Sequence, residues 1–177
     1  ADRFLAANQF SAAANEFKTL EAKFPTALTP SVRLRALTAY ASAGRTADAR
    51  TAFAAIPANA TEREAAYREL ALGLAKTRMW ADARQLLDEM RAKFPNGKLV
   101  PKTFVDLGLA AEKVKDRTQA NYFYSTAVAA FPTAVEVADA QFGAAWDKHE
   151  SGNFAISSRM LIEHLARYAD KDTDNRG

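Results

Sequence analysis

The chain has 177 residues, of which 49% are apolar and 25% charged, and its formal net charge is only +3. Basic and acidic residues are interspersed, without the basic stripe of a nucleic-acid-binding protein, so we expect no nucleic-acid partner. The absence of cysteine excludes disulfides, thiolate chemistry and the common zinc sites. No apolar run approaches the roughly 18 residues of a membrane-spanning helix, so we expect no membrane span. Frequent alanine and scarce glycine favour an all-α fold.

Five segments of the chain share one pattern of small and large residues, and most of them end in proline. Each segment starts at one of the anchor positions Phe10, Thr46, Trp80, Arg117 and Phe154. Consecutive anchors lie 36, 34, 37 and 37 residues apart. A period in the mid-thirties is typical of helix–turn–helix solenoids. We therefore predict an all-α, right-handed α-solenoid of antiparallel helix pairs with about five repeats.

The predicted units follow one another along the chain and together form a single solenoid domain. They lie near 1–29, 30–60, 61–97, 98–132 and 133–170, and residues 171–177 are expected to be a linker. Residues 1–7 can supply only the end of a first helix, and residue 1 is alanine. We therefore expect a fragment of a longer protein, from which a leader has been removed or which continues past the linker.

Two helix starts carry the sequence pattern of a capping box, in which two side chains satisfy free backbone amides reciprocally. The first pairs Thr61 with Glu64, and the second pairs Thr133 with Glu136. We predict that helices begin at these two points. Gly44 follows the predicted helix 31–43 and is expected to end it.

The fourth unit resembles the tetratricopeptide repeat. The residues that carry the resemblance are Phe104, Leu107, Gly108, Ala120, Tyr124, Ala127 and Pro132. Thr46 and Arg117 replace the aromatic anchor in two units, and Ser157 replaces alanine in the fifth. The resemblance implies that the first helices of the pairs line a groove able to hold a peptide, a protein or another domain of the same chain. The groove-lining candidates are Thr38, Arg68, Lys76, Leu109, Glu112 and Lys113.

Several residues invite a chemical interpretation that the repeat makes unnecessary. Glu150–Ser151 matches the start of the catalytic motif of lysozyme-like lytic transglycosylases, but the repeat places it in a turn between helices. His149 and His164 lie in different predicted helices, and no cluster has the ligand spacing of a metal site. We expect His164 to be packed. We expect no catalytic residue, metal ligand or cofactor site in this segment, and therefore no enzyme.

Asp170, Asp172 and Asp174 have the alternating spacing of the first half of a calcium-binding loop. Asn175 stands where such a loop has glycine, and the sequence stops before a twelfth-position glutamate. The alternative to a calcium site is a solvated acidic linker.

The aromatic residues can form either a stacking surface for sugars or bases, or the packing between helices. Trp80, Tyr124 and Phe154 lie on repeat positions, so we predict that they are core residues. Of the adjacent Tyr122 and Phe123, we expect one to be exposed.

The fifth unit resembles the last repeats of the superhelical domain in bacterial soluble lytic murein transglycosylases. The matching segments are Ala145–Trp146, 152–155, 163–168 and 174–177, together with Phe–Pro ends at Phe24, Phe94 and Phe131. The resemblance implies a periplasmic, peptidoglycan-cleaving parent whose catalytic domain is absent here, so that this segment is its non-catalytic scaffold. The alternative is a stand-alone adaptor that binds a peptide or protein in its groove, in the periplasm or the cytoplasm.

Overall fold

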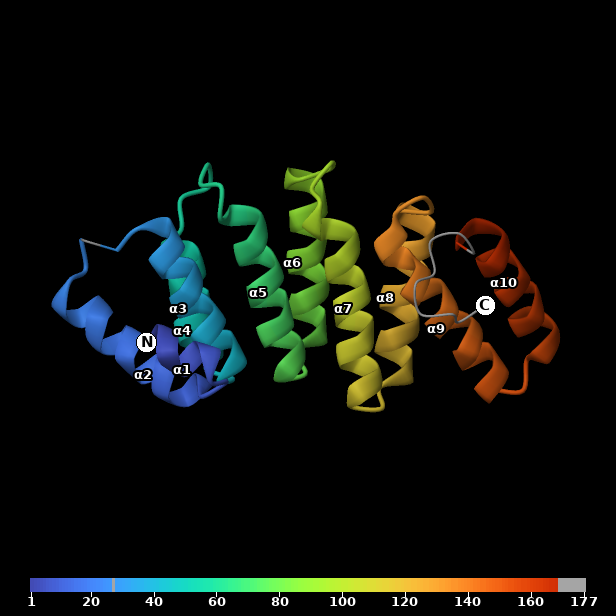
Figure 1. Ribbon diagram of the computed structural model, residues 1–177, viewed down its shortest axis with the longest axis horizontal. Coiled ribbons are helices and arrows are strands. Elements are labelled where there is room, and N and C mark those ends of the chain that lie inside the picture. The colour runs from blue at the N-terminus through green and yellow to red at the C-terminus, as the bar shows by residue number, and fades with distance from the viewer. Residues whose placement is uncertain (27, 169–177) are drawn as a thin grey trace. The chain divides into compact units, whose positions relative to one another are not determined.

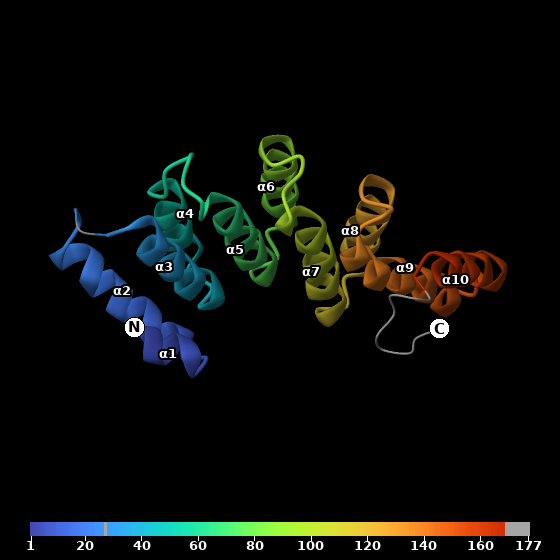
Figure 2. The same ribbon diagram turned by 45° about the horizontal axis from the view of Figure 1, so that its top comes forward.

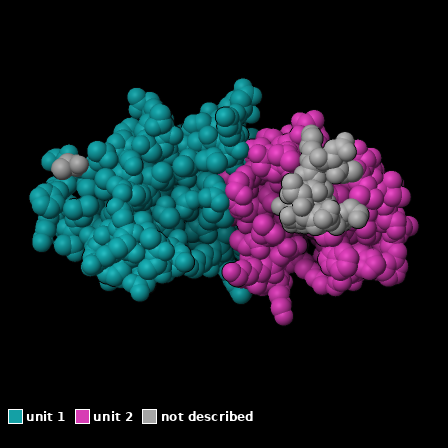
Figure 3. All heavy atoms as spheres, in the orientation of Figure 1, with its two compact units in different colours: residues 1–100 teal, residues 101–177 magenta. Residues whose placement is uncertain are grey.

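The computed structural model describes residues 1–26 and 28–168, and every regular element within them is a helix. The chain divides into two compact units, residues 1–100 and 101–177 (Figure 3). The helices are α1 (Asp2–Ala6), α2 (Phe10–Lys23), α3 (Pro30–Ser42), α4 (Thr46–Ala54), α5 (Arg63–Lys76), α6 (Trp80–Lys93), α7 (Leu99–Lys113), α8 (Arg117–Ala130), α9 (Ala138–Glu150) and α10 (Phe154–Tyr168). A short 3₁₀ helix, η1 (Val135–Val137), precedes α9.

Within each unit, helices that follow one another in the sequence pack as antiparallel pairs, which confirms the predicted α-solenoid (Figure 1). In the first unit, α3 packs against α2, α4 and α5, and α5 packs against α3, α4 and α6. Figure 2 shows α5 and α6 side by side. In the second unit, α9 packs against α8 and α10. Each hairpin thus buries its apolar side partly in itself and partly against its neighbour, as solenoid repeats do.

The sequence anchors are the first residues of the second helices α2, α4, α6, α8 and α10. Two positions before each anchor, one turn residue adopts a left-handed conformation, with φ between 55° and 79°. These residues are Asn8, Gly44, Arg78, Lys115 and Gly152. All five turns also repeat one hydrogen-bond pattern, in which the next amide reaches back five residues, as Met79 N–H does to the Leu74 carbonyl (2.9 Å). This is the Schellman-type ending that satisfies the last carbonyls of the first helix.

Small residues let the two helices of a hairpin approach closely. One position in each second helix is buried in all five repeats and is occupied by Ala13, Ala49, Ala83, Ala120 and Ser157. Between hairpins of the first unit, Gly73 lies against Ala41, where an added Cβ would come within 2.6 Å of the Ala41 Cβ. In the second unit, the Tyr124 ring occupies the space over Gly108 and Gly143.

Neither predicted capping box forms. Helix α5 begins two residues after Thr61, and the Glu64 carboxylate instead accepts a hydrogen bond from the Leu99 backbone amide (2.7 Å). The region of Thr133 and Glu136 leads into the short helix η1, and no side chain caps it. Helical segments do begin within two residues of Thr61 and Thr133, as predicted. The caps themselves were wrong: Glu64 bonds to a partner distant in sequence, and the second segment is a 3₁₀ helix without a side-chain cap.

The predicted core aromatics meet different environments. Tyr124 is buried as predicted, whereas Trp80 is only half-buried and Phe154 is 58% exposed. Trp80 and Phe154 are more exposed than Tyr124 because each is an anchor, the first residue of its helix, and lies at the end of its hairpin. Phe123 is fully buried and Tyr122 is half-buried, so neither is the exposed residue that we expected. Within residues 1–26 and 28–168, no helix combines the length and apolar character needed to cross a bilayer.

Candidate binding surface on the first helices

Three of the predicted groove residues belong to the first unit, and two of them are engaged within it. Thr38 on α3 is half-buried, and its hydroxyl donates to the Leu34 carbonyl of the preceding turn (3.1 Å). Arg68 on α5 is half-buried and forms an ion pair with Glu69 (2.8 Å). Both side chains are half-buried and already have polar partners, so Thr38 and Arg68 offer little free surface to a ligand.

Lys76, the third of these residues, is exposed at the end of α5 and reaches across to other helices. Its ammonium group donates to the Ser42 carbonyl at the end of α3, and it lies 5.8 Å from the Phe10 ring centroid. A cation at the carbonyl end of a helix is favourable because that end carries partial negative charge. Lys76 therefore joins α5 to both α3 and α2.

Phe10, Ser42 and Lys76 line two adjoining hollows of the first unit. One hollow measures about 580 Å³ and is bordered by the α1–α2 turn; the other measures about 170 Å³ and lies over α5. The remaining lining residues are Asn8, Gln9, Ser11, Ala12, Ala41, Ala43, Glu69, Leu72 and Gly73. An aromatic ring, a cation and several hydroxyl and amide groups thus face one surface.

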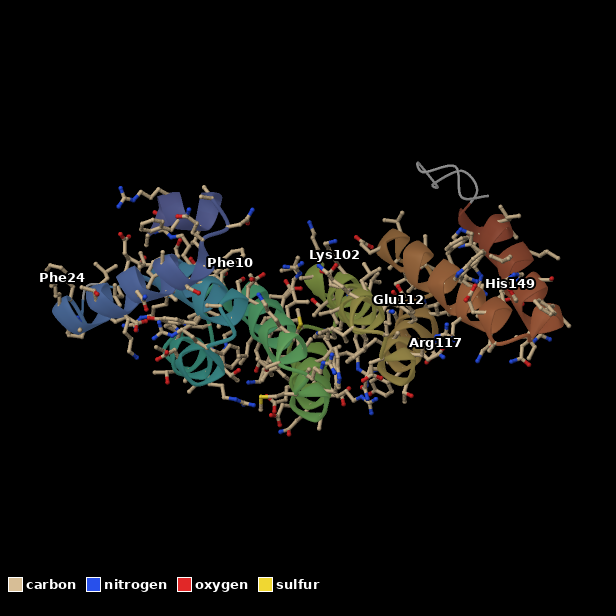
Figure 4. All side chains as sticks on the ribbon, turned by 90° about the horizontal axis from the view of Figure 1, so that it is seen from below. Phe10, Phe24, Lys102, Glu112, Arg117 and His149 are labelled. Carbon is tan, nitrogen blue, oxygen red and sulfur yellow. The ribbon has the colours of Figure 1, made fainter. Side chains whose placement is uncertain are left out.

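The other three predicted residues, Leu109, Glu112 and Lys113, are exposed on α7 in the second unit. Glu112 lines a hollow of about 440 Å³ between the α7–α8 turn, the start of α8 and the end of α9. Figure 4 shows Glu112 and Arg117 at this place. The sequence analysis did not assign the other lining residues: Lys115, Arg117, Ala120, Asn121, Tyr124, Trp146, Asp147 and Glu150.

The hollow of the second unit combines paired polar groups with an aromatic wall. The Asn121 amide donates to the Asp147 carboxylate (2.6 Å), and the Arg117 guanidinium lies 3.8 Å from the Glu150 carboxylate. Trp146 is 50% exposed, and its ring stacks on His149 with centroids 5.1 Å apart. Such a surface offers both hydrogen-bond donors and acceptors beside a large apolar face, which is the chemistry that an extended peptide meets in a groove.

Perturbed titratable groups lie outside these hollows and have structural causes. A hydrogen bond from Lys18 (2.6 Å), assisted by Arg45 (2.8 Å), lowers the pKa of the Asp48 carboxyl below its usual range. Burial raises the pKa of Tyr40, and the hydrogen bond that its hydroxyl donates to Glu21 (2.9 Å) adds to the effect. These groups connect α2, α3 and α4.

The other candidate chemical groups lie where the repeat placed them. Glu150 ends α9 and Ser151 follows it in the turn. His149 is exposed, whereas His164 is buried in α10 against the Phe142 ring. Among the residues described, no three histidine or carboxylate side chains are grouped as metal ligands. Asp170, Asp172 and Asp174 lie outside the described residues.

Comparison with known proteins identifies the class of fold. MamA superimposes with a TM-score of 0.59 at 15% identity over 96% of this chain and 95% of that chain. A putative kinesin light chain from Podosopora anserina with nearly identical TPR-like repeats gives 0.62 at 15% identity over 97% and 93%, and a variant of the same protein gives 0.61 at 16% over 96% and 91%. At such identities the likeness shows the fold alone: a TPR-like α-solenoid. No protein-family model and no curated protein sequence matches the chain.

Proposed function

We propose that this chain is a non-catalytic scaffold that binds a protein or peptide on the surface of its helical hairpins. The hollow of the second unit supports the proposal best. It places the half-exposed Trp146 beside the amide of Asn121 and the carboxylates of Glu112 and Asp147. A few residues supply most of the binding energy at protein interfaces, and tryptophan is enriched among them; polar groups around them fix the orientation of the partner.

Selection from a random peptide library on the immobilised chain tests this function. We expect the enriched peptides to bind with dissociation constants of about 1–100 μM and to lose at least about tenfold in affinity with Trp146→Ala or Asn121→Ala. Because the chain has only two tryptophans, Trp80→Phe makes Trp146 the sole fluorescent reporter of binding. Ser125→Ala, at an exposed position of the second helix α8, is the matched control. Peptides that bind the Trp146→Ala variant as tightly as the unchanged chain would contradict the assignment.

The second candidate function is that of a scaffold segment in a lytic transglycosylase-like periplasmic protein. The sequence of the fifth unit, from Ala145–Trp146 to the segment 174–177, favours it. In this proposal the partners are the catalytic domain of the same chain and peptidoglycan. Sequencing the gene beyond codon 177 tests it: a Glu-Ser motif followed by Gly-Leu-Met-Gln within the next few hundred codons is expected, and an early stop codon would exclude it.

A further inference from the structure

One side of α10 carries apolar side chains that remain exposed. Phe154 is 58%, Ile162 66% and Leu165 40% exposed. At 100° per residue, these three lie on one flank of the helix, next to the side that packs against α9. The charged residues of α10 lie on the opposite flank and are Arg159, Glu163 and Arg167. Helix α10 is thus uncharged on two sides, although packing against α9 requires only one.

Aromatic residues of α9 extend this surface. Phe142 and Trp146 stack with centroids 6.3 Å apart, and His149 contacts the Phe154 ring edge-on at 5.1 Å (Figure 4 labels His149). The two helices therefore share one surface, here named the end face. Its residues are Phe142, Trp146, His149, Phe154, Ile162 and Leu165. Exposed apolar side chains gathered on two packed helices are typical of an interaction site.

The preceding repeat shows what covers such a surface. Because the anchors of α8 and α10 are 37 residues apart, Asn121, Tyr124 and Val128 of α8 correspond to Ser158, Leu161 and Leu165 of α10. On α8 the first two of these positions contact α9: the Asn121 amide is bonded to Asp147, and Tyr124 is 2% exposed beneath Gly143. Val128 is half-buried. On α10, Leu161 is half-buried and Leu165 is exposed.

We propose that the end face binds an amphipathic α-helix of a partner protein, which packs against α10 as α9 packs against α8. The end face continues the stacking interface of the solenoid, and its equivalent is already occupied by a helix. That helix presents Ala140, Gly143 and Ala144 toward its neighbours. Small residues let the helix axes come close, so the partner helix carries alanine or glycine at matching positions and apolar residues beside them.

Binding of a helical peptide to the full chain tests the proposal. The probe is a side-chain-stapled peptide with the sequence of residues 138–150, which is the helix that covers the equivalent face of α8. We expect saturable binding by fluorescence anisotropy, with amide shifts on α10 in a ¹⁵N–¹H correlation spectrum. The double variant Ile162→Glu/Leu165→Glu, at exposed positions, is expected to bind at least about tenfold more weakly.

Two controls distinguish specific binding at the end face from nonspecific hydrophobic binding. Ile156→Glu changes an apolar residue that is 42% exposed on the charged flank of the same helix. The affinity of this variant for the peptide should equal that of the unchanged chain. A peptide with Gly143→Leu and Ala144→Leu should bind at least about tenfold more weakly, because the larger side chains hold the helices apart.

Three results would overturn the proposal. The first is undiminished binding of the peptide to the Ile162→Glu/Leu165→Glu variant. The second is the absence of saturable binding up to about 1 mM peptide. The third is a concentration-dependent dimer in sedimentation equilibrium that the Ile162→Glu/Leu165→Glu variant does not form. The last result would assign the end face to a second copy of the chain.

Discussion

At the scale of single residues, Ser157 occupies a position that is alanine in the other four repeats. It is 1% exposed, and its hydroxyl has no hydrogen-bond partner among the residues described. Ser157→Ala should stabilise the fold by about 1 kcal/mol, because it removes an unsatisfied buried polar group and raises helix propensity. Urea denaturation measures the change. Ser158→Ala, at the exposed neighbouring position, reports the propensity part alone and should gain less.

The left-handed turn residues Arg78 and Lys115 carry side chains that this conformation disfavours by about 1–2 kcal/mol. Arg78→Gly relieves that strain, while the greater freedom of glycine in the unfolded chain offsets part of the gain. We expect a net stabilisation of about 0.5–1 kcal/mol, measurable as a higher melting temperature. Gly44→Ala should have the opposite sign, and a lower melting temperature for Arg78→Gly would show that the turn is not held in this conformation.

The free energy of unfolding depends on pH through the Asp48 carboxyl. Its pKa is lowered in the folded chain, mainly by Lys18 and then by Arg45, so its stabilising contribution is complete at neutral pH. That contribution is lost as the pH falls below about 4 and passes through the lowered pKa. Asp48→Asn should cost about 1 kcal/mol at pH 7, and the cost should shrink as the pH falls through this window. Denaturant melts at pH 7, 4 and 3 measure it, and a cost independent of pH would contradict the charge-based explanation.

At the scale of helices, Arg63 satisfies the end of α4. Its guanidinium donates to the carbonyls of Phe53 (2.6 Å) and Ile56 (2.9 Å) and stacks 3.8 Å over the Phe53 ring. Arg63→Leu should cost about 2–3 kcal/mol, because charged hydrogen bonds and a cation–π contact are lost together. Thermal unfolding followed by circular dichroism measures it. Arg50→Leu removes only an exposed ion pair with Asp82 and should cost less than about 1 kcal/mol.

The sequence predicted the helices well wherever the signal was periodic. Each anchor coincides with the first residue of a second helix, because the small–large pattern that follows it is imposed by packing within the hairpin. The capping box at Thr61 failed because Glu64 bonds to an amide 35 residues away, which no local pattern reports. Trp80 was assigned to the core, but a residue at the start of a helix is covered on one side only. Trp80→Ala should therefore cost less than the roughly 3–5 kcal/mol of a fully buried aromatic residue.

The candidate surface was predictable only in part, for a geometric reason. Glu112 and Lys76 line hollows of the structure, and their helix face follows from the register of the repeat; whether they bind a partner stays a prediction. Asn121 and Trp146 were not among the predicted groove residues, because the hollow also takes residues from α8 and from the end of α9. The sequence of one hairpin does not predict how close the next hairpin lies. The left-handed turn would have been detectable from Gly44 and Gly152, had the same position been followed through all five repeats.

At the scale of the whole molecule, neighbouring helices determine which parts open first. Helices α3 and α5 each pack against three others, whereas α10 packs mainly against α9 and exposes its flank. We expect amide hydrogens of α10 to exchange faster than those of α3 and α5 in native-state hydrogen exchange, because fewer buried contacts oppose local opening. The helical probe should slow exchange in α10 and leave α3 unchanged. Uniform exchange across the three helices would contradict this order.

The five matching turns also determine where the chain can tolerate extra residues. Each turn has the same length and hydrogen bonds, so the differences among spacings of 36, 34 and 37 residues must arise elsewhere. They arise in the helices as well as in the connections that leave the second helices. Helix α4 has 9 residues where α2, α6 and α8 have 14, and the connections 55–62 and 94–98 also differ in length. A fluorescent tag or a protease site inserted at residues 58–60 should therefore leave the hairpins intact, whereas a single residue added beside Arg78 would change the register of the hairpin that it closes.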